Sequence, residues 1–381
     1  MFFFAIDASS ANKPERTGVE WYAFHLIQQL KKHALAADEQ VILYSPTPLS
    51  APLSDLPPQW QSRVLDWRLP AGWMQGRVAW ELFRRPPNVF FVPSQGLPIV
   101  FPHDIKTHHA TATTLHDIGF RRIPGAYSAS MRRELESLTR RAVKRATKIL
   151  TVSAFSKQEL MDAYRLPEDR IVVTPLAADP AFYHPGLEAA DAGILEKHRL
   201  GKQFFLYVGR LEQKKNSAIL IRAFDEFKQR RGVGDPFELV LAGPHGYGFE
   251  EIKALYDASP FKNQIRNLGY IPTDEVAALM RAARAFLFPS WYEGFGIPLL
   301  EAMACGTPVI ASDIPAHREV AADAAQFVPP GDVEAWVSML EKTAFQAADR
   351  EAMKQKGFAR AAMFTWEKTA NATWEALRGM V

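Results

Sequence analysis

The hydrophobic positions of the chain form short apolar runs that alternate with segments of helical spacing. In the first half these runs are rich in β-branched and aromatic residues: FFFAI, QVILYS, NVFFVP, ATTLH, KILTVS and IVVTP. The second half starts again with FFLYV and continues with FELVLAG, IRNLGYI, AFLFPS and PVIAS. Such runs predict buried strands, and their alternation with helices predicts parallel sheets covered by helices on both faces.

The segments between the runs predict amphipathic helices. Apolar residues recur near helical spacing at Trp21, Phe24, Leu26 and Ile27, at Met131, Leu135, Leu138 and Ala142, and at Ile219, Leu220, Ala223, Phe224 and Phe227. The pattern fades over HPGLEAADAGILEKHRLGK. We therefore predict two doubly wound α/β domains, 1–185 and 202–362, joined by a linker over 186–201 and followed by a last helix over 363–381.

Composition is that of a soluble globular protein. The chain has 381 residues, of which 48% are hydrophobic and 23% charged, and its net charge is only +3. So weak a charge gives no case for a nucleic-acid partner. The single cysteine excludes an internal disulfide and disfavours a cysteine-based zinc site, and we expect Cys305 to be a small buried residue.

No apolar stretch approaches the length of a membrane span. The opening MFFFAID lacks a basic leader and its apolar run ends at Asp7, so it predicts a first strand and not a signal peptide. We expect a cytoplasmic location. The run RRELESLTRRAVKRATK predicts a basic helix, and a solvated face is the default interpretation of such a helix. A surface for anionic lipid is the alternative, so attachment to the inner face of a membrane stays open.

The stretch YEGFGIPLLEAMACGTPVIAS places two carboxylates around a Gly-x-Gly turn that opens a helix. Free N–H groups at such a helix start attract anions, and Glu301, about one turn in, can point back toward the same ligand. Pro298 suits the first helical position. The stretch predicts a phosphate-binding site in which Glu293 and Glu301 are placed to bind neighbouring hydroxyl groups of the ligand. The alternative is that Glu301 only complements the helix dipole and Glu293 is solvated.

The stretch YVGRLEQKKN follows a predicted strand with a tight turn and two cations. Gly209 lets the backbone turn, and Arg210 and Lys215 lie where ligands bind in an open α/β sheet. Arginine offers bidentate contact to a diphosphate and lysine a mobile charge. A solvated basic loop is the alternative reading.

Other motifs narrow the chemistry. His116 follows a strand in ATTLHDIGF, and Gly18 precedes a helix in ERTGVEWY, a second candidate anion seat. The chain has no phosphate-binding loop of the usual NTPases, no G-x-G-x-x-G fingerprint and no Asp-x-Asp metal clamp. His103, His108 and His109 lack the carboxylate spacing of a metal site, so we predict no metal ligand.

The motif order resembles that of the group 1 (family 4) retaining glycosyltransferases, and most closely their mannosyltransferase-like branch. The motifs are the two glutamates of EGFGIPLLEAMACGTPVIAS, then VGRLEQKKN, LGYIPTDEVAALMRAARAFLFPSWYEGFG, ASDIPAHREV, VPPGD, LHD and TVSAFSKQEL. The resemblance implies the GT-B fold: two Rossmann-like domains facing across a cleft. It also implies that the last helix, FTWEKTANATWEAL, crosses back to the first domain.

The resemblance also implies roles for residues that hold the donor. Arg210 and Lys215 would bind the diphosphate, beside the backbone of Phe295, Gly296 and Ile297.

Further assignments concern the sugar and the base. Glu301 would bind the ribose hydroxyls, Glu293 would contact the donor sugar, and His116 would reach that sugar from the first domain. Tyr270 and Ile271 would border the base, and Gly18 would lie near the phosphates or the acceptor.

Three positions depart from the family pattern. Asn216 replaces a frequent glycine, Glu20 stands where a second glycine is common, and TPLAADP replaces an Asn-Gly pair.

The sequence thus predicts a hexosyltransferase of polysaccharide or glycoconjugate synthesis. We expect it to use a nucleotide sugar, with GDP-mannose as the expected donor, and a glycan or lipid-linked glycan acceptor. No cofactor or metal is expected, since the nucleotide sugar is a substrate and two cations can neutralise its diphosphate. The alternatives are a UDP-sugar-dependent transferase of the same fold, a nucleotide-sugar epimerase, and an inactive subunit that binds nucleotide or glycan.

Overall fold

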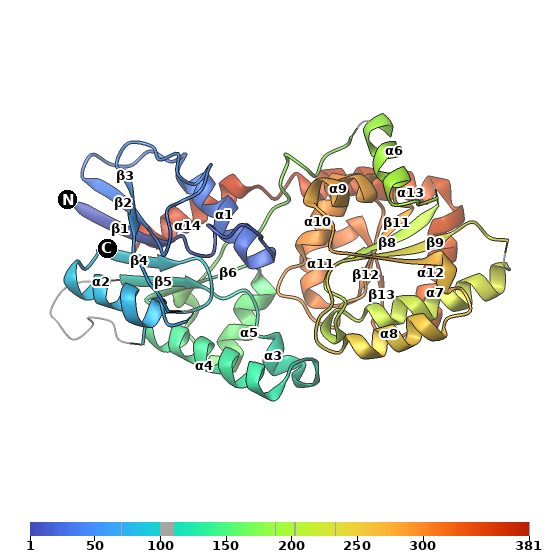
Figure 1. Ribbon diagram of the computed structural model, residues 1–381, viewed down its shortest axis with the longest axis horizontal. Helices are drawn as coiled ribbons and strands as arrows, with labels where there is room; N and C mark the ends of the chain where they lie inside the picture. The colour runs from blue at the N-terminus through green and yellow to red at the C-terminus, as the bar shows by residue number, and fades with distance from the viewer. Residues whose placement is uncertain (70, 100–109, 187, 202, 233, 381) are drawn as a thin grey trace. The chain divides into compact units, whose positions relative to one another are not determined.

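The computed structural model describes residues 1–69, 71–99, 110–186, 188–201, 203–232 and 234–380 (Figure 1). The chain forms two compact units. Unit 1 comprises Met1–Ile118, Arg133–Leu176 and Trp366–Val381, and unit 2 comprises Gly119–Arg132 and Ala177–Thr365. His103, His108 and His109, where we predict no metal site, lie outside the described residues.

Unit 1 contains a seven-stranded sheet in which every described pairing is parallel. The strand order is β3-β2-β1-β4-β5-β6-β7. Phe4 in the centre pairs with Val41 on one side and Val89 on the other. The strands are β1 (Phe2–Asp7), β2 (Glu39–Ser45), β3 (Trp60–Val64), β4 (Val89–Val92), β5 (Ala110–Thr114), β6 (Lys148–Thr151) and β7 (Ile171–Val173).

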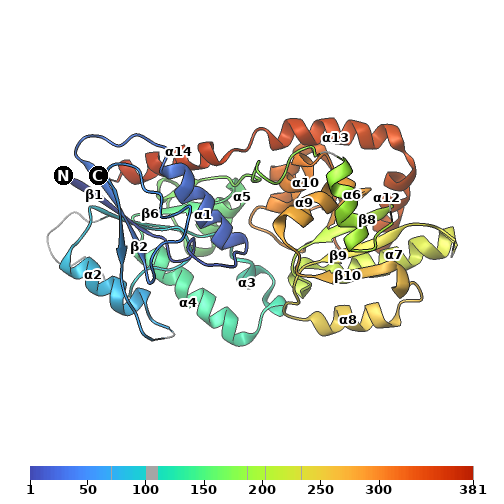
Figure 2. The same cartoon turned by 45° about the horizontal axis from the view of Figure 1, so that its top comes forward.

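Helices cover both faces of this sheet. The views show α1 (Gly18–Leu30) and α14 (Trp366–Arg378) over one face, and α2 (Ala79–Arg84) and α4 (Ala129–Arg145) over the other (Figures 1 and 2). Helix α5 (Ala154–Tyr164) connects β6 to β7. The last helix packs into this unit through Trp374, whose ring lies 5.1 Å from that of Phe4 and whose indole N–H donates to Leu30 O. Met131 was expected on the buried stripe of α4 but is 43% exposed, and the buried positions of the helix are Thr139 and Ala142.

Unit 2 contains a six-stranded sheet in the order β10-β9-β8-β11-β12-β13, again with parallel pairings throughout. Its strands are β8 (Phe204–Val208), β9 (Glu238–Ala242), β10 (Ile265–Gly269), β11 (Ala285–Phe288), β12 (Val309–Ser312) and β13 (Ala325–Val328). The predicted stripe of the helix after β8 is buried, and Phe224 and Phe227 join Phe205 and Phe237 in the core. Both units therefore have the parallel α/β architecture that the hydrophobic pattern predicts.

The helices of unit 2 also divide between two faces. Figure 2 shows α7 (Ser217–Arg231) and α8 (Phe249–Ala258) on one face, and α9 (Thr273–Ala282) and α10 (Ile297–Ala304) on the other. The remaining helices are α3 (Gly119–Arg122), α6 (Glu188–Lys197), α11 (Pro315–Ala321), α12 (Val333–Phe345) and α13 (Ala347–Ala361).

The expected linker over 186–201 is in fact largely helical. Helix α6 occupies most of it and packs on α9 of unit 2. Arg281 of α9 forms a paired contact with Asp191, with Nη2 2.6 Å and Nε 2.8 Å from the two carboxylate oxygens. The sequence did not predict this helix because its apolar residues do not recur clearly at helical spacing. The ion pair between Arg281 and Asp191 holds it against α9.

In the part of the chain that the structure describes, none of the helices combines the length and the apolar character needed to span a bilayer.

Candidate functional site

The chemistry-bearing loops of unit 2 meet where the strand order of its sheet reverses. Strand β8 lies between β9 and β11, so the chain leaves β8 toward one side and returns to its other side with β11. Loops that follow two such neighbouring strands diverge and leave a crevice at the carboxyl ends. The loop after β8 carries Arg210 and Lys215, and the loop after β11 carries Glu293 and leads into α10. This switch point is the candidate site.

Glu293 and Lys215 form a buried ion pair at the switch point. Lys215 Nζ lies 2.6 Å from Glu293 Oε1, and Glu293 is only 6% exposed. Ser290 Oγ donates to the same oxygen at 2.7 Å. Burial by itself raises the pKa of Glu293, but the charges of Lys215 and Lys214 and the two hydrogen bonds outweigh it, so the pKa falls below the ordinary value. Glu293 is therefore a fixed carboxylate at neutral pH.

Glu301, on the first turns of α10, meets the opposite electrostatic environment. Burial and the charge of Asp179 raise the pKa of Glu301 to about 8, although a hydrogen bond with Tyr183 opposes the shift. Tyr183 is itself 8% exposed, and its backbone N–H donates to Asp179 O at 2.9 Å. Arg281 holds the same turn by donating to Phe182 O at 3.2 Å. A fixed turn thus presents the Tyr183 hydroxyl to a carboxyl that is largely protonated at neutral pH.

The turn into α10 depends on glycine. Gly296 precedes the helix with φ +106°, a left-handed conformation that other residues rarely adopt. A Cβ at this position would lie 3.2 Å from Leu299 and 3.5 Å from His317. Phe295 is 4% exposed and packs edge-on against Phe364. The helix begins at Ile297, so Pro298 is its second residue and not its first as expected.

The turn after β8 brings two glycines into close contact. A Cβ on Gly243 would lie 2.0 Å from Gly209 O, and Gly209 itself has φ +154°. Arg210 follows and is exposed, and within the described residues no ion pair of its guanidinium is found. Its side chain is therefore available to an anionic ligand.

Asn216, a departure from the family pattern, is accommodated in this loop. It adopts the left-handed conformation with φ 54°, which glycine and asparagine tolerate best. Its side-chain amide donates to Pro289 O at 3.1 Å and to Pro330 O at 2.7 Å. The asparagine thus ties the start of α7 to the loops after β11 and β13.

Tyr270 and Ile271 follow β10 at the sheet edge, away from the switch point by two strands. Tyr270 is 66% exposed, while Ile271 is buried. Their assignment to the base stays a prediction.

The two candidates of unit 1 lie at different places. His116 follows β5; its ring bonds the Pro93 backbone, and its Nε2 is buried without a partner among the described residues. Burial lowers the pKa of His116 to about 4, so the ring is neutral. Gly18 is the first residue of α1, and the Glu20 carboxylate already occupies the N-terminus of this helix. Glu20 accepts a hydrogen bond from the Thr17 backbone N–H and forms an ion pair with Lys13 at 2.8 Å. An anion that binds at Gly18 would therefore have to compete with the Glu20 carboxylate.

Three residues of the site were not expected from the sequence: Tyr183, Ser290 and His317. His317 is buried beneath Gly296, its Nδ1 lies 2.9 Å from Ser312 O, and burial lowers its pKa to about 4. The motif ASDIPAHREV was quoted for the family resemblance, but nothing in its residues indicates contact with the loop of Glu293. Tyr183 lies far from Glu301 in the chain, so no local pattern connects them.

Comparison with known proteins decides the family. Residues 195–360 match the family model of "Glycosyl transferases group 1", and residues 16–182 match that of "Glycosyltransferase Family 4". The chain is also 33% identical over 303 residues to an O-antigen chain mannosyltransferase B of Escherichia coli, covering 79% of this chain and 77% of that protein. The chain belongs to the group 1 glycosyltransferases. The family suggested by the two-glutamate motif is confirmed, and the protein is a glycosyltransferase.

Solved structures agree on the fold of this group 1 glycosyltransferase. Sucrose-phosphate synthase from Thermosynechococcus elongatus aligns with a TM-score of 0.76 at 17% identity, over 100% of this chain and 99% of that one. HepE of Anabaena, solved with UDP and glucose, aligns with a TM-score of 0.75 at 15% identity, over 99% of both chains. Together with the two parallel α/β units, these similarities confirm the predicted GT-B fold.

Proposed function

We propose that this glycosyltransferase moves a mannosyl residue, with retention of configuration, from GDP-mannose to a hydroxyl of a glycan or lipid-linked glycan in surface-polysaccharide synthesis. The similarity to an O-antigen chain mannosyltransferase over most of both chains carries the proposal. The geometry of unit 2 supports the reaction type, because a buried carboxylate and two cations share the switch point of its sheet.

The chemical step follows from these charges. The bond between the anomeric carbon and the diphosphate oxygen breaks, and its electron pair stays on the leaving diphosphate. Arg210 and Lys215 stabilise that negative charge together with the N-terminus of α10. Glu293 lies beside the sugar and stabilises the positive charge that grows on the ring. The acceptor oxygen bonds to the anomeric carbon from the departing side, and its proton goes to the leaving phosphate.

The remaining donor contacts are assigned to Glu301 for the ribose hydroxyls and to the Phe295–Ile297 backbone for the diphosphate. His116 in unit 1 is assigned to the donor sugar, and its neutral ring with an unpartnered buried Nε2 suits a hydroxyl partner. A protein nucleophile is not needed, since the leaving phosphate accepts the proton. Nor is a divalent ion needed, since Arg210 and Lys215 provide the positive charge.

The proposal is tested by incubating the purified protein with GDP-mannose, UDP-glucose and UDP-galactose, with a mannose-terminated acceptor and with excess EDTA. We expect GDP release and an α-linked product, unaffected by EDTA. Release of UDP alone would show that the donor is a UDP-sugar. Formation of an epimerised nucleotide sugar would show that the enzyme isomerises the nucleotide sugar instead of transferring its sugar. Binding without turnover of any donor would indicate an inactive subunit. Loss of transfer in EDTA with rescue by manganese would overturn the metal-free mechanism.

We further propose that the protein attaches to the inner face of the membrane through α4. The exposed residues of this helix include Arg132, Arg140 and Lys144, and such a basic face suits anionic lipid. Vesicles with phosphatidylglycerol should sediment the protein at low salt, while neutral vesicles should not. Equal sedimentation with both would overturn this attachment.

A further inference from the structure

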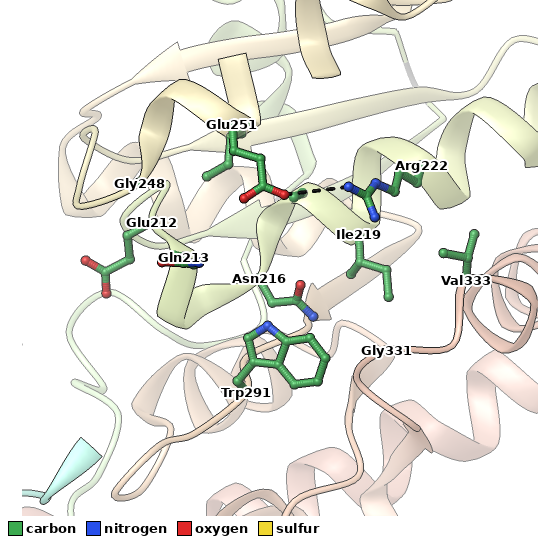
Figure 3. Close-up of a pocket in the computed structure, with 12 residues that line it drawn as sticks. Glu212, Gln213, Asn216, Ile219, Arg222, Gly248, Glu251, Trp291, Gly331 and Val333 are labelled. Atoms are coloured by element: carbon green, nitrogen blue, oxygen red, sulfur yellow. Dashed lines mark ion pairs between the residues drawn. The ribbon is translucent and has the colours of Figure 1, made fainter. Parts of the chain in front are cut away.

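Unit 2 contains a pocket whose walls differ from those of the donor site. Its volume is about 320 Å³, at the lower end of the range that small ligands occupy. It opens between the first turns of α7 and α8 and the loops before Trp291 and Val333 (Figure 3). None of the residues that line it is assigned to the nucleotide sugar. Its principal walls are Asn216, Ile219, Arg222, Glu251, Trp291 and Val333.

One wall of the pocket is aromatic and accessible. Trp291 is 42% exposed, although a large indole is normally placed where it can be covered. Its ring lies at one side of the pocket, with Ile219 and Val333 beyond it (Figure 3). Gly331 borders the ring so closely that a Cβ there would lie 3.2 Å from the indole. Because glycine has no side chain, none covers the indole ring from this position. The Trp291 wall therefore offers a flat apolar face to a ligand.

The facing wall is polar but carries little net charge. Arg222 Nη2 lies 3.6 Å from Glu251 Oε1, and both side chains are more than half exposed, so they can turn toward a ligand (Figure 3). Glu212 adds a negative charge at the other end. With two carboxylates and one guanidinium, the lining disfavours a phosphate. Carboxylates and a guanidinium instead match a neutral ligand rich in hydroxyl groups, since they accept and donate several hydrogen bonds.

We propose that this pocket binds a neutral pyranose unit of the glycan on which the enzyme acts. A pyranose ring presents an apolar face of C–H groups, which fits Trp291, and an edge of hydroxyls, which fits Glu251 and Arg222. The inference rests on the proposed function for the identity of the glycan.

The position of the pocket explains how such binding would serve transfer. The backbone N–H of Trp291 donates to Lys214 O at 3.0 Å, and the Asn216 side chain donates to Pro289 O and Pro330 O, in the loops that carry Trp291 and Gly331. The walls are therefore anchored to the two loops that carry Lys215 and Glu293. A glycan held here stays attached beside the donor loops between successive additions, which raises its effective concentration.

The test measures glycan binding without any turnover. Saturation-transfer NMR with mannotetraose should give a dissociation constant in the millimolar range for the native chain, unchanged by saturating GDP. Trp291→Ala should weaken this binding at least tenfold, and Glu251→Ala about fivefold, because one removes the apolar face and the other a hydroxyl partner. Trp80→Ala is the matched control, since Trp80 is 55% exposed but lies in unit 1. Melting temperatures of all variants identify any loss of folding.

Each outcome decides the inference separately from the proposed function. Loss of binding in the two pocket variants but not in the control supports it. Absence of mannotetraose binding to the native chain, equal loss in Trp80→Ala, or displacement of the glycan by GDP would overturn it, the last because the pocket would then belong to the donor site. GDP-mannose turnover in the native chain, measured apart, decides the proposed function whatever the pocket binds.

Discussion

Of the two carboxylates around the turn into α10, Glu293 is buried and Glu301 is half-buried, and their electrostatic environments are opposite. Glu293 lies against Lys215 and Ser290, and the pKa of its carboxyl is lowered despite burial. Glu301 has Tyr183 and the charge of Asp179 as neighbours, and its pKa is raised to about 8. Burial pushes both pKa values upward, so the presence of a cation decides the sign at Glu293.

This difference matches two different tasks. A carboxylate that must stabilise positive charge on a reacting sugar needs to be ionised in every encounter, and the lysine ensures it. A carboxyl that binds ribose hydroxyls needs its charge only while the nucleotide is bound, and protonation spares the free enzyme the cost of holding a desolvated charge. The two carboxyls belong to one sequence motif, so the motif alone does not distinguish them. Their neighbours in the fold, Lys215 for Glu293 and Tyr183 for Glu301, come from distant segments of the chain and determine the role of each.

The largest effect should come from removing the cation beside Glu293. Lys215→Ala leaves a buried carboxylate without the amine bonded to it, and such a change costs about 3 kcal/mol of unfolding free energy. Urea unfolding measures the loss. The double variant Lys215→Ala/Glu293→Gln removes the uncompensated charge and should recover most of it. If the single and double variants unfold at the same urea concentration, the pair does not fix the ionisation of Glu293.

The next prediction separates the two glutamates by nucleotide affinity. Above pH 8, where Glu301 is ionised, Glu301→Ala should weaken GDP binding about ten- to a hundredfold, since a charge-assisted hydrogen bond contributes roughly 1.5–3 kcal/mol. Glu293→Gln should leave GDP affinity almost unchanged and lower turnover instead, because its carboxylate acts on the sugar. Calorimetry with GDP and steady-state kinetics with the donor measure the two effects. Equal weakening of GDP by both variants would contradict the division of roles.

The hydrophobic pattern predicted the interior strands of both sheets and one edge strand of each, β7 and β10, but missed the other edge strand of each sheet. The missed strands are β3, whose sequence WQSRV has exposed positions in its middle, and β13, the short AQFV. Both lie at the end of a strand order. An edge strand has one neighbour and part of its surface is solvated, so it need not carry the apolar run by which central strands are found.

The candidate site was predictable only where its residues are close in sequence. The glutamates, Gly296, Arg210 and Lys215 stand in motifs, and the sheet order then brings their loops together. Tyr183 lies in a turn just before the expected linker, and its pairing with Glu301 depends on α6 and Arg281 holding that turn. Contacts between segments so far apart are fixed by packing, which a single sequence does not display.

A smaller effect should appear in the pH dependence of nucleotide binding. Ribose hydroxyls donate best to an ionised Glu301, so binding must displace the proton that a pKa of about 8 retains at neutral pH. GDP affinity should therefore rise with pH up to about 8 and then level off, by no more than about tenfold per pH unit. Calorimetry between pH 6 and 9 measures the slope. Glu301→Gln is the control for the titration of GDP itself, and an identical slope in this variant would remove Glu301 from the binding equilibrium.

The smallest predicted effect concerns Tyr183, which touches Glu301 but is not assigned to the nucleotide. Tyr183→Phe keeps the buried ring and deletes one hydrogen bond, which contributes about 1 kcal/mol, so GDP affinity should fall about fivefold at most. Because that bond lowers the pKa of Glu301, its loss should also move the pH at which GDP affinity levels off to a higher value. A purely structural tyrosine would lower the melting temperature without moving this point. The same pH series on Tyr183→Phe distinguishes the two, with Tyr247→Phe as a control, since Tyr247 lies in the same unit, is exposed and has no assigned role in nucleotide binding. An unmoved levelling point would mean that the ionisation of Glu301 is set by burial and Asp179 alone.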